Sequence, residues 1–432
     1  MTGQTRVFPK LLRFGAFILF AFVLWGKPAA AQFSLIPMDD TQSDHLRAYG
    51  VAYWALEAPR DWVVEWVLNY RGGAFIVYNT DEIKRKCILE GVTVESLSQQ
   101  GRDSILKQIE SSNMELVTLE KAPKVAIYAP PNHEPWDDAV TLALEYSKIP
   151  YDKIWDPEVL SDEIQKYDWV HLHHEDFTGQ YGKFYRSFRN APWYRERVRL
   201  YQQSAKEAGF DTVAEHKRAV TVHIANYVSQ GGFLFAMCSA CDTIDIALSA
   251  EGIDIIEPEI DGTPMTAGAQ DKLRYDNCLM FEDFTLYPDP MRYEFSNIDC
   301  GPTDGLPPVY QNPRFGLIEF SAKHDPVPSM LTQCHVDEVP EFRGQTSAFR
   351  KEFIKDDARV LGEFQGEGAV KYVHRNFGEG TVTFLGGHDP EDYEHIVGEP
   401  ATDLSLHKNS PGYRLILNNI LFPAAKKKQR ET

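Results

Sequence analysis

The segment around Cys238 is the feature that most constrains the fold of this 432-residue chain. An apolar run, Phe233–Met237, precedes the cysteine, and Ser239-Ala240-Cys241 follows it at the start of a stretch with helical character. Ala236 and Ala240, two residues before and two after Cys238, are small enough for a tight strand-to-helix turn. Parallel sheets carry such turns at the carboxyl ends of their strands, where functional sites gather. The pattern therefore predicts an elbow with Cys238 at its tip.

A second strand-like run, Thr381–Leu385, ends in Gly386-Gly387-His388-Asp389-Pro390-Glu391. A cysteine and a histidine–carboxylate pair at two strand ends are the parts of a Cys–His–acid site. We expect Cys238 to be the nucleophile and His388 its base, with Glu391, or else Asp389, orienting the histidine. A helix amino terminus and a nearby His388 would both lower the pKa of the Cys238 thiol.

Before the Cys238 segment, strand patterns alternate with helical patterns. Short apolar runs occur at 125–129, 151–155 and 169–173, and helical spacing of apolar residues occurs at 136–147 and 219–228. This alternation predicts an α/β fold with a doubly wound parallel sheet.

The chain divides into four parts on composition and pattern. We expect a signal peptide over residues 1–31, a small α/β domain over 32–120, the main domain over 121–425 and a basic tail over 426–432. In the small domain, residues 44–56, 61–70 and 98–111 have helical patterns, and 74–78 has a strand pattern. A β-rich insertion at about 252–365, rich in Pro, Asp and Gly, would form a lid or a wall of the pocket.

The amino-terminal residues have the pattern of an export signal. Arg6, Lys10 and Arg13 form a basic region, an apolar stretch follows at 14–25, and Ala29-Ala30-Ala31 offers a cleavage site before Gln32. The apolar stretch is short for a membrane span, although an uncleaved anchor helix is the alternative. The sequence predicts a periplasmic or secreted protein without stable membrane insertion after cleavage.

Charge and cysteine content narrow the class of partner. The formal net charge is −19, so nucleic acid is excluded as a partner, and a small molecule, a sugar or a peptide is expected.

Six cysteines are few for a disulfide scaffold of this length. Pairings of Cys238 with Cys241 and of Cys278 with Cys300 stay open. Cys238-Ser239-Ala240-Cys241 is also a C-x-x-C at a helix start, so redox chemistry is an alternative to hydrolysis.

A dense polar cluster, His171-Leu172-His173-His174-Glu175-Asp176, lies at the end of another expected strand. We expect His174 and Glu175 to contact substrate, together with His133 on the same sheet edge and the Ser239 amide as an oxyanion donor. Other oxyanion amides would come from the loop at 174–179. No cofactor and no metal is expected, and His171, His173 and Asp176 are the alternative metal ligands.

Four short motifs carry a resemblance to a known superfamily. Ala236-Met237-Cys238-Ser239-Ala240 stands where glutamine amidotransferases have Gly-x-Cys-x-Gly, and His388-Asp389-Pro390-Glu391 stands where they have His-Pro-Glu. Gly378-Glu379-Gly380 and Leu385-Gly386-Gly387-His388 match the Gly-x-Gly and Leu-Gly-His of ThuA-like proteins with one extra residue. Residues 124–425 thus resemble the class I glutamine amidotransferase-like superfamily, in its ThuA-like branch. The resemblance implies a flavodoxin-like fold and a link to carbohydrate use.

The whole chain also resembles exported bacterial proteins labelled "asparagine synthetase B-like". Such synthetases need a cysteine directly after the initiator Met and a Ser-Gly-Gly-x-Asp-Ser loop for pyrophosphate, whereas this chain has Thr2 and no such loop. We therefore expect no asparagine synthetase activity. The expected function is an exported hydrolase or amidase acting on an amide or acyl bond. The alternative is a non-catalytic, envelope-associated protein that binds a carbohydrate or a peptide in the same cleft.

Overall fold

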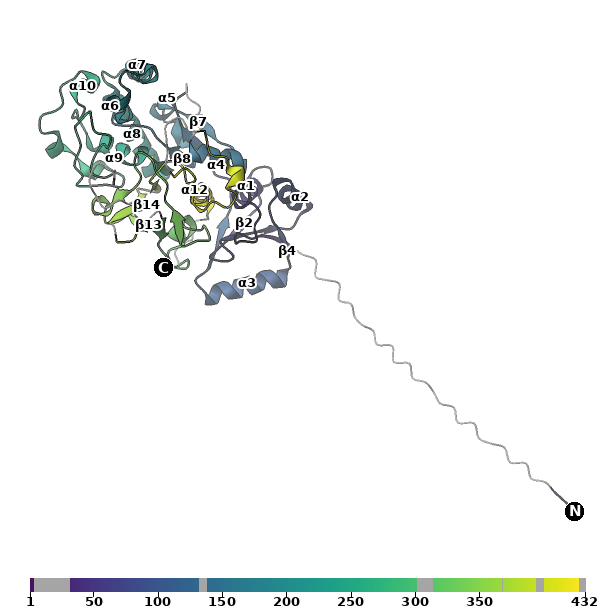
Figure 1. Cartoon of the computed structure of the whole chain (residues 1–432). Helices are drawn as coiled ribbons and strands as arrows, with labels where there is room; N and C mark the ends of the chain where they lie inside the picture. Colours follow the sequence, from purple (N-terminus) through teal and green to yellow (C-terminus); the bar gives the residue numbers. More distant parts are fainter. Residues whose placement is uncertain (4–31, 132–137, 301–313, 367, 394–399, 427–432) are drawn as a thin grey trace.

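The structure is a computed structural model that describes residues 1–3, 32–131, 138–300, 314–366, 368–393 and 400–426. It contains a five-stranded sheet and a ten-stranded sheet (Figure 1). The expected signal peptide lies outside the described residues, apart from Met1 to Gly3. Within the described ranges, we find no helix with the length and apolar character that a membrane crossing requires.

The smaller sheet is built from the amino-terminal part of the chain. Its order is β4-β1-β3-β2-β5 and every pair is antiparallel. The strands are β1 (Phe33–Ile36), β2 (Val64–Leu68), β3 (Ala74–Tyr78), β4 (Glu95–Leu97) and β5 (Glu115–Leu119), and the helices are α1 (His45–Leu56), α2 (Asp81–Glu90) and α3 (Gln99–Ser111).

Strand β2 corrects the expectation of a helix over residues 61–70. The segment is rich in valine and tryptophan, which favour a pleated, half-buried surface over a helix. Trp66 is fully buried and its ring lies 5.5 Å from that of Phe75 on β3. Its neighbour Glu65 reaches the other face and pairs with Arg102 of α3. Cross-strand packing therefore determines that this segment forms a strand, although its apolar residues also have a helical spacing.

The larger sheet has the order β11-β10-β13-β14-β15-β9-β8-β6-β7, with β12 beside β14. The run from β15 to β7 is parallel, and the remaining pairs are antiparallel. The parallel strands are β6 (Val125–Tyr128), β7 (Asp152–Ile154), β8 (Trp169–Leu172), β9 (Phe233–Met237) and β15 (Gly380–Leu385). The others are β10 (Arg314–Leu317), β11 (Glu338–Pro340), β12 (Phe349–Arg350), β13 (Arg359–Phe364) and β14 (Ala369–Phe377). The expected α/β class is thus confirmed, with a mixed rather than purely parallel sheet.

Helices cover both faces of the parallel strands. On β9, Phe235 and Met237 belong to one apolar core, whereas Leu234 and Ala236 belong to another. The first core contains α4 (Ala139–Ser147) and α12 (Pro411–Leu421), and the second contains α8 (Val213–Ser229) and α9 (Ala240–Ser249). The remaining helices are α5 (Asp156–Leu160), α6 (Tyr185–Phe188), α7 (Pro192–Glu207), α10 (Pro258–Asp261) and α11 (Pro326–Leu331).

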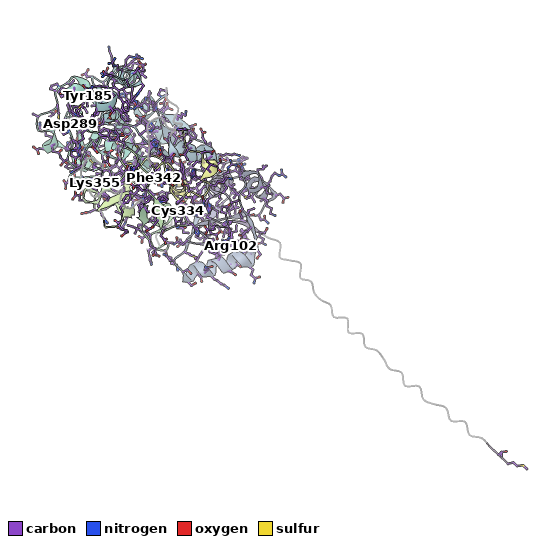
Figure 2. All side chains as sticks on the ribbon, viewed as in Figure 1. Arg102, Tyr185, Asp289, Cys334, Phe342 and Lys355 are labelled. Atoms are coloured by element: carbon purple, nitrogen blue, oxygen red, sulfur yellow. The ribbon has the colours of Figure 1, made fainter. Side chains whose placement is uncertain are left out.

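The two sheets share the first of these cores. Helix α1 of the amino-terminal part packs on α4 and α12, and these three helices lie together in Figure 1. Residues 118–120 also pair with the chain end, since the Lys426 amide donates to the Thr118 carbonyl at 2.8 Å. Arg102 lies at the opposite end of the molecule from Tyr185 and Asp289 (Figure 2).

The expected insertion at 252–365 has two roles. Strands β10 to β13 extend the sheet beyond β14, a role that the expectation of a lid did not include. The loop at 342–347, in contrast, packs against the ends of the parallel strands. Its Thr346 carbonyl accepts the Gly387 amide at 2.8 Å, and its Arg343 carbonyl accepts the His388 amide at 2.7 Å. This loop is therefore bonded to the residues that follow β15, and the expected role of a pocket wall stays a prediction.

Gly50 provides a test of the packing between the two parts. A Cβ at Gly50 of α1 would lie 1.9 Å from the Ser147 carbonyl oxygen of α4, so the two helices would have to separate. We expect Gly50→Ala to lower the free energy of unfolding by about 2–4 kcal/mol, despite the better helix propensity of alanine. Urea unfolding measures this. At Gly316 a Cβ would meet ordinary contacts only, so Gly316→Ala is the control and should change stability little. Equal stability of both variants would contradict the close helix crossing.

Candidate active site

Cys238 lies at the carboxyl end of β9, a central strand with parallel neighbours on both sides, as expected. Its φ of 52° is in the left-handed region, which a non-glycine residue adopts only under constraint. Two hydrogen bonds hold it: the Cys238 amide donates to the Gly387 carbonyl at 3.0 Å, and the Ala240 amide donates to the His173 carbonyl at 3.0 Å. The elbow is thus tied to the ends of β15 and β8.

Burial dominates the chemistry of the Cys238 thiol. The residue is 2% exposed, and Sγ accepts the Gln345 amide at 3.4 Å, with further help from the amides of Ser239 and Thr346. Desolvation nevertheless raises the pKa of the thiol to about 11. The expected lowering of this pKa by the helix terminus was wrong, because removal from water outweighs the amides and the helix dipole. The resting thiol is neutral at pH 7.

The amides around Sγ come from an element that the sequence did not indicate. Ser239 was expected as a donor, but Gln345 and Thr346 belong to the 342–347 loop rather than to the loop at 174–179. Gln345 also joins the two loops, since its Nε2 donates to the Gly182 carbonyl at 2.8 Å. No motif marks this loop, so only the tertiary structure reveals it.

His388 is buried shortly after the end of β15, and the carbonyl of the preceding Gly387 accepts the Cys238 amide of the elbow. Gly387, with a φ of 91°, makes the turn, and a Cβ there would lie 2.7 Å from the Phe342 carbonyl oxygen. The His388 ring contacts two other histidines, with centroid distances of 4.5 Å to His173 and 6.0 Å to His174. The structure therefore places the expected base in a group of imidazoles.

The two carboxylates after His388 have partners in the carboxyl-terminal segment. Glu391 forms an ion pair with His407 at 2.8 Å and accepts the Tyr393 hydroxyl at 3.0 Å. Asp389 accepts the Glu391 amide at 2.9 Å, and burial raises its pKa. The orienting role of either carboxylate stays a prediction.

Asp138, His171 and His173 form a buried chain that leads to His388. His171 Nε2 lies 3.3 Å from Asp138 Oδ2 and 3.2 Å from His173 Nδ1, and its Nδ1 lies 3.0 Å from the Phe235 carbonyl oxygen. His171 on β8 and His173, directly after this strand, lie on the same side and contact each other, as expected. Burial opposes ionisation of Asp138, but the charge and hydrogen bond of His171 and the amides of α4 outweigh it and lower its pKa.

Asp138 is a site residue that the sequence analysis missed. It is the N-cap of α4, where its Oδ1 accepts the amides of Val140 at 2.7 Å and Thr141 at 3.0 Å. An aspartate directly before an apolar helical run is an N-cap signal. The sequence therefore contained a sign of its position, although not of its contact with His171.

The polar cluster after β8 separates into two groups. Asp176 orders its own loop by accepting the amides of Thr178 at 2.7 Å and Gly182 at 2.8 Å, and the metal-ligand sets of the described residues do not include it. These amides hold the carboxylate, and its alternative role as a metal ligand stays a prediction. His174 and Glu175 instead line a pocket of about 290 Å³, counting space open to solvent, with Asp176, Gly179, Tyr181, Gly182, Arg197, Tyr201 and Val213. His133 lies outside the described residues.

Two sets of side chains in the described residues have the arrangement of metal ligands. His173, His174 and His388 form one set, and Asp138, His171 and His173 form the other. Within each set the possible ligand atoms lie within 4.8 Å of one another. His173 belongs to both.

Buried titratable groups lie behind the cysteine. Burial raises the pKa of Asp242, on the first turn of α9, to about 7, and its Oδ1 accepts the Thr346 hydroxyl at 3.0 Å. Burial lowers the pKa of Lys371 to about 7, and its Nζ donates to the carbonyls of Phe342 and Ser347. All six cysteines are free thiols, so Cys238 and Cys241 form no disulfide in this structure.

Comparisons with known proteins give only remote likenesses. No family model and no curated protein sequence matches the chain. Among solved structures, cytoplasmic proteins STM1381 and STM3548 of Salmonella typhimurium are 14% and 12% identical, each over 70% of this chain and 100% of theirs, with TM-scores of 0.34 and 0.32. Gan42B, a GH42 beta-galactosidase from G. stearothermophilus, is 11% identical over 62% of this chain and 28% of its own, with a TM-score of 0.27. At these scores the likenesses support no conclusion about function.

The raised pKa of Asp242 predicts a pH-dependent stability. The group is protonated in the folded chain up to about pH 7 but ionises near pH 4 when unfolded, so its contribution is fully present below pH 4 and is lost as pH rises through 7. We expect Asp242→Asn to be as stable as the parent near pH 4 and more stable at pH 8 by a few kcal/mol, since a tenfold difference in proton affinity corresponds to roughly 1.4 kcal/mol. Urea unfolding across this range measures the difference. The surface substitution Asp271→Asn is the control, and a constant difference between Asp242→Asn and parent would contradict the raised pKa.

Proposed function

We propose that this protein is a hydrolase that cleaves an amide or acyl bond with Cys238 as the nucleophile. The observation that carries the proposal is the constrained backbone of Cys238, with φ 52° at the carboxyl end of a central parallel strand and Sγ beside backbone amides. Evolution retains such strain where it positions a functional group. The adjoining end of β15 supplies His388 as the base.

The neutral thiol determines the order of the chemical steps. A thiol with a pKa of about 11 is not a preformed thiolate, so its proton passes to the imidazole as sulfur attacks the carbonyl carbon. The resulting oxyanion accepts the amide hydrogen bonds near Sγ. The imidazolium then donates its proton to the leaving amine or alcohol, which leaves a thioester on Cys238. Water, deprotonated by the same imidazole, releases the acid and restores the thiol.

The orienting acid in this proposal is Asp138 rather than Glu391. Asp138 contacts His171, His171 contacts His173, and the His173 ring lies 4.5 Å from that of His388. An ionised carboxylate at the end of this chain favours positive charge on the imidazoles when His388 takes up a proton. Glu391 is already paired with His407.

The resemblance of the sequence to class I glutamine amidotransferases supports the same proposal. A flavodoxin-like, ThuA-like domain would have its nucleophile at the elbow and its histidine after the last parallel strand, which are the positions of Cys238 and His388 here. Alanines replace both glycines of the elbow, and one residue is added before the proline. We propose export to the periplasm or beyond on the signal pattern of residues 1–31.

One observation favours binding without catalysis as the second candidate. Cys238 is almost fully buried, whereas the pocket beside His174 presents Tyr181, Tyr201 and the cation Arg197. A sugar or a peptide with an anionic group would suit that lining. In this case the pocket would bind ligand while Cys238 stays unmodified.

Acylation of Cys238 separates the two candidates. With p-nitrophenyl acetate as the probe, mass spectrometry of peptides should find an acetyl thioester on Cys238, formed faster than on any other cysteine. Cys238→Ala should remove it, and His388→Asn should slow it by roughly 10²–10⁴-fold, because the neutral thiol depends on its base. Cys241→Ser is the matched control and should acylate normally. An unreacted Cys238 in folded protein would rule out the hydrolase and favour binding.

The orienting acid is tested by paired substitutions on the same assay. We expect Asp138→Asn to slow acylation of Cys238 by at least about tenfold and to move its pH profile toward lower pH, because the imidazoles bind a proton less tightly without the carboxylate. Glu391→Gln should change the rate and the profile little. The reverse result would return the orienting role to Glu391.

A further inference from the structure

We propose that His173, His174 and His388 bind one late first-row divalent metal ion, for which Zn²⁺ is the representative. The proposal goes beyond the thiol hydrolase and does not rest on it. It concerns a ligand set that the sequence did not indicate, since the set joins the end of β8 to the end of β15.

The geometry of the three side chains suits a compact metal site. Their possible ligand atoms lie within 4.8 Å of one another, and His173 and His388 are buried. In a tetrahedral zinc site the nitrogen ligands are about 3.3 Å apart, so the rings would close by about 1.5 Å at most. Rotation of imidazole rings about their side-chain torsions supplies movements of this size.

His174 provides an independent observation that points to a ligand. Its Nδ1 is buried and has no hydrogen-bond partner among the described residues. A buried polar atom without a partner costs free energy, which a metal at that nitrogen would recover. The same histidine lines the pocket, so the ion would be reachable from solvent.

A supporting shell already orients His173. Its Nδ1 lies 3.2 Å from His171 Nε2 and 3.7 Å from Asp138 Oδ1, which assigns coordination to Nε2. Carboxylate–histidine contacts of this kind fix the ring and the tautomer of metal-bound histidines. The shell reaches into the sheet, where His171 Nδ1 contacts the Phe235 carbonyl.

The ligand types select the class of metal. Three imidazoles favour zinc and its neighbours over magnesium or calcium, which prefer oxygen. Three protein ligands also leave one position of a tetrahedron open for water or for a substrate oxygen. Asp176 contributes nothing here because its own loop holds it.

Metal binding and thiol chemistry compete for His388. A neutral imidazole has one lone pair, which serves either the metal or the proton of the Cys238 thiol. Zinc should therefore slow acylation of Cys238, and a chelator should restore it. This effect connects the two proposals without making one depend on the other.

The test uses the full mature protein, stripped with a chelator and titrated with Zn²⁺ in a calorimeter. We expect one equivalent per chain, and intense visible absorption from four-coordinate Co²⁺ when cobalt replaces zinc. His174→Asn should abolish stoichiometric binding, and His171→Asn should weaken it by about 10–100-fold. Cys238→Ser should bind metal normally, so failure of the thiol chemistry and failure of the metal site are distinguishable.

His223→Asn is the matched control, because His223 pairs with Asp162 on the surface of α8, away from the three ligands. Circular dichroism checks that each variant is folded. Should His174→Asn not fold, the cobalt spectrum of the parent decides, since four-coordinate cobalt absorbs intensely in the visible and a thiolate ligand would add a charge-transfer band in the near ultraviolet. Binding below one equivalent in the parent, or binding that survives His174→Asn, would overturn the proposal.

Discussion

The hydrogen bonds that fix the Cys238 elbow are the constraint on which the rest of the site depends. The Cys238 amide is held by the Gly387 carbonyl and the Ala240 amide by the His173 carbonyl, so one turn is bonded to the strand ends on both sides. These bonds hold Cys238 in a left-handed conformation and bring His173 and His388 to one place. Loss of the register between β9 and β15 would separate the thiol from the histidines.

Burial decides what this arrangement can do. A thiol that is exposed to water and lies near a helix terminus and near histidines would ionise readily. At Cys238, however, desolvation raises the pKa of the thiol to about 11. The same effect keeps Asp242 protonated to about pH 7 and lowers the pKa of Lys371 to about 7. At this edge of the sheet, burial therefore shifts the pKa of Cys238, Asp242 and Lys371 more than the neighbouring charges do.

The histidine group explains why one site supports two proposals. The carbonyl of Gly387, the residue before His388, accepts the Cys238 amide, and the His388 ring lies within ligand distance of His173 and His174, as a metal site requires. A single lone pair on His388 makes the two roles exclusive at any moment. Asp138 would serve both proposed roles, since it contacts His171 and His171 contacts His173.

The sequence by itself determined the α/β class, the parallel strands that end at Cys238 and His388, and the common face of His171 and His173, because strand period and turn chemistry are local properties. It did not determine β2, where packing of Trp66 on Phe75 overrode a helical spacing. Only the tertiary structure decided that the Gln345 backbone amide donates to the Cys238 sulfur, that Glu391 pairs with His407 and that Asp138 contacts His171. Each of these contacts joins segments distant in the chain, and the burial that raises the pKa of Cys238 likewise exists only in the folded protein.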